Sequence, residues 1–196
     1  MGAKGSKSKN SQKKLTQEDM LKLSKKTHFS LEQVQKIYRQ FHSLSNSQIA
    51  DNLIDIHEFQ AALGLSSTEF TERIFAAFDS DGSSEIDFFE FVIGLSALSP
   101  AATLEEKATF CFAVYDIDKN GFIDKNELKE VLTFSLVGNA SVHLSETQLE
   151  KIIEITFKKM DTNGDGEISL EEFTIEAKKN PAILSCVNLN LEGLLG

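Results

Sequence analysis

The chain has 196 residues and a formal net charge of −10, with two cysteines and no tryptophan. This length can bury a sizeable core in one globular unit or two small lobes, whereas Cys111 and Cys186 stand too far apart to suggest a disulfide framework or a zinc site. The acidic balance disfavours nucleic acid as a partner, and no apolar run reaches the roughly eighteen residues of a membrane span.

Residues 1–15 predict an acylated basic tail. The sequence begins Met-Gly-Ala-Lys-Gly-Ser, which fits the pattern for acylation of Gly2. One myristoyl chain binds a membrane only marginally, and the five lysines of the tail supply a second signal of about 1 kcal/mol each near an anionic leaflet. We therefore expect a cytoplasmic protein that is partly membrane-associated at the cytoplasmic leaflet. The alternative is an ordinary lysine-rich tail.

From Thr16 the apolar spacing becomes helical, and most later helices are marked by a capping box, in which Ser or Thr is followed three residues later by Glu or Gln. The predicted starts are Ser30 with Gln33, Ser66 with Glu69, Thr103 with Glu106, Ser145 with Gln148 and Ser169 with Glu172. The second, third and fourth of these helices are predicted to end at Phe78, Tyr115 and Met160. A short break after Leu98 separates residues 16–98 from residues 99–180.

Residues 116–127 place oxygen-bearing side chains at the first, third, fifth, ninth and twelfth positions of one loop. Calcium takes six to eight oxygen ligands at about 2.3–2.6 Å, and this spacing supplies them. Gly121 stands at the sixth position, where the loop turns with a positive φ. The predicted side-chain ligands are Asp116, Asp118, Asn120 and Glu127, with Phe122 binding through its carbonyl and Asp124 through a water.

Two further loops follow the same spacing. In residues 161–172 the predicted ligands are Asp161, Asn163, Asp165, the Glu167 carbonyl and Glu172, with Ser169 acting through a water. In residues 79–90 they are Asp79, Asp81, Ser83, the Glu85 carbonyl and Glu90, with Asp87 acting through a water. Here Ser84 replaces the turn glycine, and Gly82 stands two positions earlier. The strain on Ser84 is about 1 kcal/mol, which predicts about a fivefold weaker site.

The first loop is degenerate and has fourteen residues, 45–58. Asp51, Asp55 and Glu58 stand where ligands return to the metal, and Asn52 replaces the turn glycine. Either carbonyl oxygens complete a metal site here, or the loop only pairs structurally with the second one.

The repeat of helix, acidic loop and helix organises the whole chain. Each loop carries an isoleucine at the equivalent position, and these side chains predict short antiparallel bridges between the first and second loops and between the third and fourth. The four residues are Ile54, Ile86, Ile123 and Ile168. The predicted fold is all-α, with two lobes that each contain a pair of EF-hands.

Four hands in this order resemble the calcineurin B superfamily, which includes calcineurin B, the calcineurin B-like kinase regulators and the neuronal calcium sensors. The two-residue insertion in residues 45–58 is typical of the calcineurin B-like proteins, and residues 104–116 are similar to that group. The Cys-Pro of the neuronal sensors and the terminal Phe-Pro-Ser-Phe of the calcineurin B-like proteins are missing. The resemblance implies a Ca²⁺-binding regulator of a phosphatase catalytic subunit or of a serine/threonine kinase.

Fifteen phenylalanines exceed what four small loops require. We expect those of the paired helices to line an inner apolar surface that calcium exposes to an amphipathic helix of a target enzyme, although most would simply be core. The relevant residues are Phe75, Phe78, Phe88, Phe89, Phe91, Phe110, Phe112 and Phe134.

The apolar tail, residues 181–196, is either a lid over this surface or a permanently packed last helix. No catalytic motif is present, so we expect no enzyme. The alternatives to a sensor are a membrane switch like the neuronal sensors, a plain calcium buffer or a permanent structural subunit.

Overall fold

The computed structural model describes residues 15–45, 52–63, 68–137 and 145–187. Gly2, the tail lysines, Asp51 and Ser66 lie outside the described residues, as does the end of the apolar tail from residue 188. In chain order the elements are α1 (Gln17–Lys26), α2 (Leu31–Leu44), α3 (Ile56–Leu63), α4 (Thr68–Phe78), α5 (Phe88–Leu98), α6 (Leu104–Tyr115), β1 (Phe122–Ile123), α7 (Lys125–Val137), α8 (Glu146–Met160), β2 (Ile168–Ser169), α9 (Leu170–Lys179) and the 3₁₀ helix η1 (Pro181–Val187).

The helix starts follow local hydrogen bonding. Four helices begin at the predicted capping boxes, with the N-caps Ser30, Thr103, Ser145 and Ser169. Two further boxes, Thr16 with Asp19 and Asp87 with Glu90, begin α1 and α5. The sequence pattern missed them because Asp replaces one member of the usual pair, although its carboxylate accepts the same amide hydrogens. The ends of α4, α6 and α8 fall where they were predicted.

The isoleucine pairing is confirmed in both lobes. Ile54 forms an isolated antiparallel bridge with Ile86. In the other lobe Ile123 of β1 pairs with Ile168 of β2 in a two-stranded antiparallel sheet. The hands are therefore α2–α3 joined to α4–α5, and α6–α7 joined to α8–α9. The all-α fold of paired EF-hands follows from these two connections.

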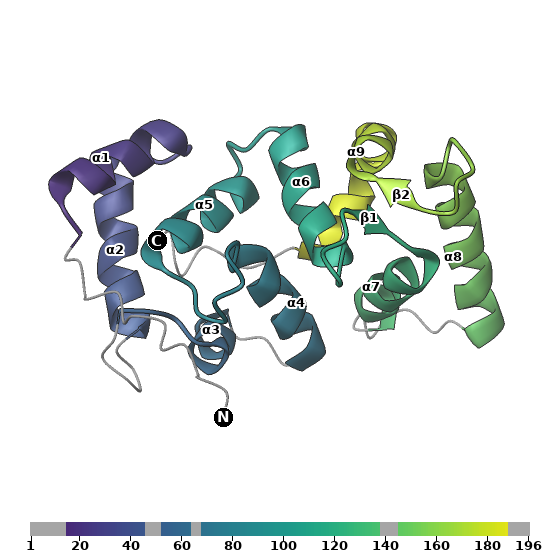
Figure 1. Ribbon diagram of the computed structural model, residues 1–196, viewed down its shortest axis with the longest axis horizontal. Helices are drawn as coiled ribbons and strands as arrows, with labels where there is room; N and C mark the ends of the chain where they lie inside the picture. Colours follow the sequence, from purple (N-terminus) through teal and green to yellow (C-terminus); the bar gives the residue numbers. More distant parts are fainter. Residues whose placement is uncertain (1–14, 46–51, 64–67, 138–144, 188–196) are drawn as a thin grey trace, which may run out of the picture.

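Figure 1 shows the two lobes side by side, with α1, α2, α3 and α5 on one side, α7, α8 and α9 on the other, and α4 and α6 at the centre where the lobes meet. One continuous cluster of buried apolar side chains runs through both of them. At the junction the rings of Phe78 and Phe110 meet edge to face at 5.3 Å between centroids. Within the first lobe, a Cβ on Gly94 of α5 would lie 2.3 Å from the Phe78 ring, so this glycine allows α4 and α5 to approach closely.

The helix α1 precedes the four hands and packs against α2 and α5. The residues that follow it reach the second lobe, because Nε2 of His28 lies 2.8 Å from Oε2 of Glu106 in α6. The backbone N–H of His28 also donates to Oγ of Ser96 in α5, at 3.0 Å. None of the helices in the described ranges combines the length and hydropathy of a transmembrane span.

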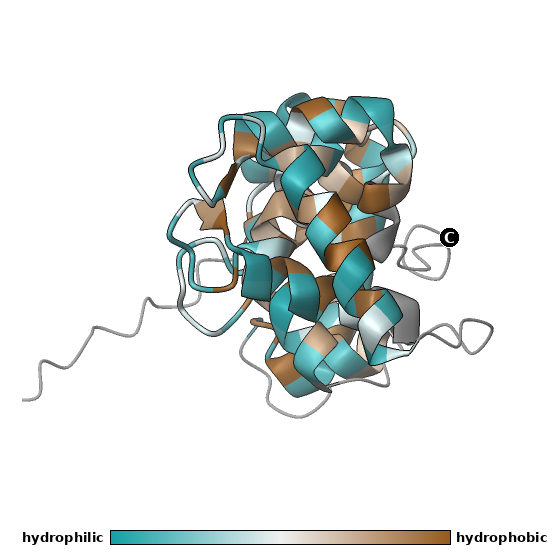
Figure 2. Ribbon diagram, turned by 90° about the vertical axis from the view of Figure 1, so that its right-hand side faces the viewer, coloured by the Kyte–Doolittle hydropathy of each residue, from teal (hydrophilic) through white to brown (hydrophobic). Residues whose placement is uncertain are grey.

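Apolar residues face inward along the helices, and brown and teal segments accordingly alternate on them in Figure 2. Most of the phenylalanines singled out above are core residues, namely Phe75, Phe78, Phe88, Phe91, Phe110 and Phe112. Phe89 is different, with 36% of its surface exposed on the outer face of α5. The side chain of Phe134 lies outside the described part of the chain.

Candidate metal centres

In the third loop the side chain of Glu127 joins the two ends of the loop. Its Oε1 accepts hydrogen bonds from the backbone N–H groups of Ile117 at 2.8 Å and Asp118 at 3.3 Å, and its Oε2 accepts one from Asp124 at 2.8 Å. Carboxylate oxygens of Asp116, Asp118 and Glu127 lie within 4.8 Å of one another. Like charges this close repel each other, and a cation between them would offset the repulsion.

The closing glutamates of the second and fourth loops are held in the same way. Oε1 of Glu90 accepts from the N–H groups of Ser80 at 2.9 Å and Asp81 at 3.3 Å. Oε1 of Glu172 accepts from the equivalent residues, Thr162 at 3.0 Å and Asn163 at 3.3 Å. The twelfth-position carboxylates of all three loops therefore point into their own loops.

The aspartate at the first position orients the turn of each loop. Its two carboxylate oxygens accept backbone N–H groups from the fourth to sixth positions, as the 3.0 Å bonds from Asn120 and Gly121 to Asp116 show. In the second loop, Asp79 accepts from Ser83 at 3.0 Å and Ser84 at 2.8 Å. In the fourth loop, Asp161 accepts from Gly164 at 2.7 Å and Gly166 at 3.1 Å.

At the third and fifth positions, side-chain oxygens accept amide hydrogens within the loop. Oδ1 of Asp81 accepts from Ser83 at 2.9 Å, and Oδ1 of Asp118 accepts from Asn120 at 3.0 Å. In the fourth loop, Oδ1 of Asn163 accepts from the N–H of Asp165 at 2.9 Å. These bonds orient the side chains predicted as ligands.

The residues predicted to bind through carbonyls all immediately precede a paired isoleucine. They are Glu85, Phe122 and Glu167, and Phe122 belongs to β1. The residues predicted to act through water begin the exiting helix. Asp87, Asp124 and Ser169 accept the backbone N–H of the closing glutamate at 2.9, 2.8 and 3.3 Å.

Two positions of the loops have left-handed backbone. At the sixth position φ is +67° at Ser84, +91° at Gly121, +90° at Gly166 and, at the turn of the first loop, +63° at Asn52. At the fourth position φ is +70° at Gly82, +57° at Lys119 and +76° at Gly164. Gly82 is thus not a displaced turn glycine but occupies a left-handed position of its own. The strain expected at Ser84 is present as well.

Glu172 shows the electrostatic state of a closing carboxylate. Burial alone would raise the pKa of Glu172, but hydrogen bonds from the backbone and hydroxyl groups of Ser169 and Thr162 outweigh it and lower the pKa to about 2. The carboxylate is therefore ionised at neutral pH, which is the form that binds a cation.

Of the first loop, the structure describes Ser45 and the residues from Asn52 onward. Oδ1 of Asp55 accepts the N–H groups of His57 and Glu58, both at 2.8 Å, so this side chain caps α3. Glu58 is buried, and its Oε2 accepts the N–H of Asp55 at 3.3 Å. The structure thus brings two of the three predicted residues together. Asp51, the third, lies outside the described residues.

The residues present fit calcium. They form oxygen-rich, largely anionic loops with a preformed turn, and their donors are those that this hard cation prefers. In the second and third loops, carboxylate oxygens of three residues lie within 4.8 Å of one another. This convergence is the structural observation that supports the fit.

Comparison with known proteins also indicates calcium-binding EF-hands. The EF-hand domain pair family matches residues 105–178. Calcineurin B of Candida glabrata is 36% identical over 147 residues, covering 75% of this chain and 81% of the relative. The type 2 calcineurin B of Homo sapiens is 34% identical over 148 residues, covering 76% and 84%. The chain belongs to the calcineurin B family. It is accordingly an EF-hand protein of the regulatory-subunit class, and its cofactor is Ca²⁺.

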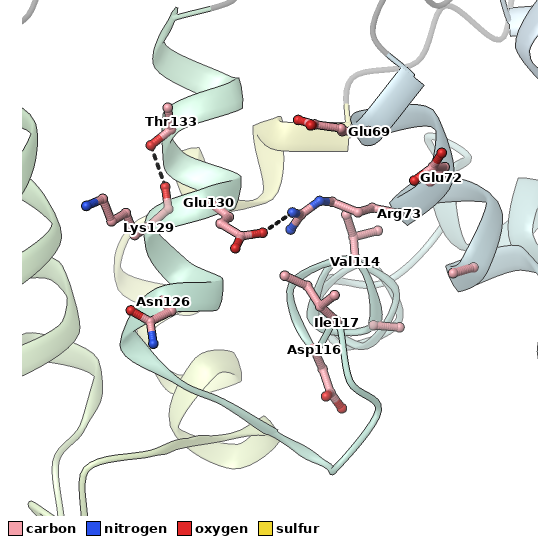
Figure 3. Close-up of a pocket in the computed structure, with 12 residues that line it drawn as sticks. Glu69, Glu72, Arg73, Val114, Asp116, Ile117, Asn126, Lys129, Glu130 and Thr133 are labelled. Atoms are coloured by element: carbon pink, nitrogen blue, oxygen red, sulfur yellow. Dashed lines mark hydrogen bonds and ion pairs between the residues drawn. The ribbon is translucent and has the colours of Figure 1, made fainter.

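The side chains that connect the two lobes of this calcineurin B-family chain are not marked by any pattern in its sequence. A cleft of about 870 Å³ lies between α4, α6 and α7, and Asp116 and Ile117 line one end of it. Figure 3 shows Arg73 of α4 and Glu130 of α7 facing each other across the cleft, where they form an ion pair. Nearby, Nζ of Lys119 donates to the backbone carbonyl of Asp79 at 3.2 Å. No local pattern signals such contacts, because each joins residues of different hands.

Proposed function

We propose that this chain is a calcium-responsive regulator that binds a helix of a target enzyme. The target class is a phosphatase catalytic subunit, as the resemblance to calcineurin B implies, or a serine/threonine kinase. The unit comprises the two lobes, residues 16–98 and 99–180. The calcium ligands are the residues of the second, third and fourth loops named above, and the candidate ligands of the first loop are Asp51, Asp55 and Glu58.

The placement of η1 is the observation that carries this proposal. This apolar segment of the chain lies against α6, α7 and α9. The backbone carbonyl of Ile183 accepts a hydrogen bond from Oη of Tyr115 at 3.4 Å, and that of Leu184 lies 3.6 Å from Sγ of Cys111. The second lobe therefore has a surface that accepts a short apolar helical segment, which is what a target helix would present.

In this proposal η1 acts as a lid. Ile183 and Leu184 are only partly buried and pack on the edge of the core. These two side chains are not part of the fully buried core, so a target helix with a larger apolar face can displace the segment. Calcium supplies positive charge to the carboxylates of the loops, and the exiting helices that begin at their ninth positions transmit any change in the loops to this surface.

A calcium titration with a hydrophobic dye tests the proposal. We expect dye fluorescence to rise with calcium in the wild type and to stay flat when Glu90, Glu127 and Glu172 are all changed to Gln. Calcium binding without a rise in dye fluorescence would identify a plain buffer instead. A pull-down with and without calcium then identifies the target, and capture that ignores calcium would indicate a permanent structural subunit.

A paired substitution tests the lid. Ile183→Asp with Leu184→Asp should release η1 and raise dye binding in the absence of calcium. Ile93→Asp with Ile155→Asp is the matched control, because these side chains on α5 and α8 are 52% and 67% exposed and the pair introduces the same two charges. Equal dye binding by the two variants would contradict the lid.

Gly2 and the tail lysines are proposed to add a membrane contact. The acylated protein should sediment with vesicles that contain anionic lipid, and Gly2→Ala should abolish this. Neutral vesicles should bind less, because the lysines then lose their partner. Equal sedimentation of Gly2→Ala and the wild type would exclude the anchor.

A further inference from the structure

Lys119 stands at a position where the other complete loops have glycine. Its φ of +57° lies in the left-handed region, and the equivalent residues are Gly82 in the second loop and Gly164 in the fourth. A Cβ on either glycine would meet no atom within 4 Å, so backbone conformation rather than space favours glycine there. The third loop retains a lysine in this strained conformation, and the side chain of that lysine makes a contact that glycine could not make.

The side chain of Lys119 reaches the other lobe. Its Nζ donates to the backbone carbonyl of Asp79 at 3.2 Å. Asp79 ends α4, because its own N–H donates to the carbonyl of Phe75 at 2.8 Å. A carbonyl at the C-terminal end of a helix lacks an intrahelical partner and lies at the negative end of the helix dipole, so an ammonium group is a favourable donor to it.

The same residue, Asp79, is the first proposed ligand of the second loop. Its carboxylate already accepts the N–H groups of Ser83 and Ser84. Lys119 thus holds the main chain of a residue whose side chain organises the neighbouring calcium loop. Lys119 itself contributes no ligand to either loop.

A second contact ties α4 to the third hand. Arg73, midway along α4, forms an ion pair with Glu130 of α7 across the cleft of Figure 3. The Arg73 side chain is only 12% exposed, whereas that of Glu130 is 53% exposed, so the arginine side of this pair is shielded from solvent. The entering helix of the second hand is therefore held by the third hand at its middle and at its end.

We propose that Lys119 is a positioning residue that couples the third calcium loop to the second across the two lobes. A cation in the third loop fixes the backbone from which Lys119 extends, and Lys119 in turn fixes Asp79 at the start of the second loop. Filling the third loop therefore raises the calcium affinity of the second, and by linkage the second does the same for the third. This inference rests on the calcium ligands of the proposed function.

The test is a double-mutant cycle read separately at each loop of the full chain. Calcium is titrated into ¹⁵N-labelled protein, with the Gly82 amide reporting the second loop and the Gly121 amide the third. Glu127→Gln disables the third loop. In the Lys119 background we expect this change to weaken the second loop by about threefold to tenfold, the scale of one hydrogen bond. In the Lys119→Met background the loss should be less than about twofold.

Three variants separate coupling from charge and from loop strain. Lys125→Met removes the same charge from the same loop, but Lys125 pairs only with the exposed Glu154 of its own lobe among the interactions described, so coupling should remain. Lys119→Gly relieves the left-handed strain and should still uncouple the loops. Lys119→Arg keeps a long cationic donor and should restore at least part of the coupling.

The outcomes are distinguishable. Equal losses from Glu127→Gln in the Lys119 and Lys119→Met backgrounds overturn the coupling while leaving the proposed sites intact. Equal uncoupling by Lys119→Met and Lys125→Met also overturns it, because charge alone would then account for the effect. A Gly82 amide that never responds to calcium overturns both the second site and the coupling.

Discussion

Ile54 and Ile86 exchange two backbone hydrogen bonds, from the N–H of Ile54 to the carbonyl of Ile86 at 3.0 Å and in the reverse direction at 2.9 Å. Both side chains are fully buried. The degenerate first loop is thereby joined to the second loop whether or not it binds calcium itself. Pairing with the neighbouring loop and supplying calcium ligands are separate roles of these loops. Ile54 and Ile86 serve the pairing and are not calcium ligands.

Ile86→Ala should lower the free energy of unfolding by about 2–5 kcal/mol, the usual cost of removing a fully buried isoleucine side chain. Urea unfolding without calcium measures this. Ile155→Ala is the control, since its exposed side chain should cost no more than about 0.5 kcal/mol beyond helix propensity. Similar losses from both substitutions would contradict a stabilising role of the buried Ile86 side chain.

Glu127→Gln and Glu172→Gln should each weaken calcium binding more than Glu58→Gln does. Both closing glutamates belong to loops with a complete ligand set, so each change removes one charge and half of a bidentate contact. We expect at least about a tenfold loss, equivalent to roughly 1.4 kcal/mol, at the altered loop. Isothermal calorimetry measures the three variants side by side, and equal losses would refute the ranking.

The features that the sequence predicted best are those built from short windows. The N-cap at Ser30 and the pairing of Ile123 with Ile168 each follow from residues at fixed spacing within one repeat. The left-handed turn at Asn52 was likewise predictable, because asparagine tolerates this conformation better than most residues. Local hydrogen bonding decides these features before tertiary packing is considered.

Contacts between the hands could not be predicted in this way. Lys119 and Asp79 are 40 positions apart, Arg73 and Glu130 are 57 apart, and His28 and Glu106 are 78 apart. Each depends on how two lobes pack, and a charged surface residue gives no sign of a distant partner. The exposure of Phe89 has the same origin, since only packing decides which face of an almost wholly apolar helix reaches solvent.

Ser84→Gly should raise the calcium affinity of the second loop by about fivefold. The substitution removes about 1 kcal/mol of left-handed strain from a residue with φ of +67°. The reciprocal change, Gly121→Ser in the third loop, where φ is +91°, should lower affinity by a similar factor. Amide shifts of the two loops in a calcium titration measure both. An unchanged second loop in Ser84→Gly would show that the loop is limited by its ligands rather than by its turn.

Glu106 should make the fold sensitive to acid. The backbone N–H of Thr103, the His28 side chain and the Thr103 hydroxyl all donate to this carboxylate, and together they lower the pKa of Glu106 from 4.5 to about 2. Because the pKa is lower in the folded state, the ionised carboxylate stabilises the fold fully above about pH 4.5. That contribution is lost progressively as the pH falls from about 4.5 towards 2.

Comparing the wild type with Glu106→Gln isolates this contribution, because glutamine still completes a capping box but does not titrate. Urea unfolding without calcium, between about pH 6 and pH 2, should show the wild-type advantage shrinking as the pH falls below about 4.5. Glu32→Gln, in the exposed first turn of α2, provides the control for removing an acidic residue. A stability difference between the wild type and Glu106→Gln that does not change with pH would mean that the hydrogen bonds of Glu106 do not depend on its charge.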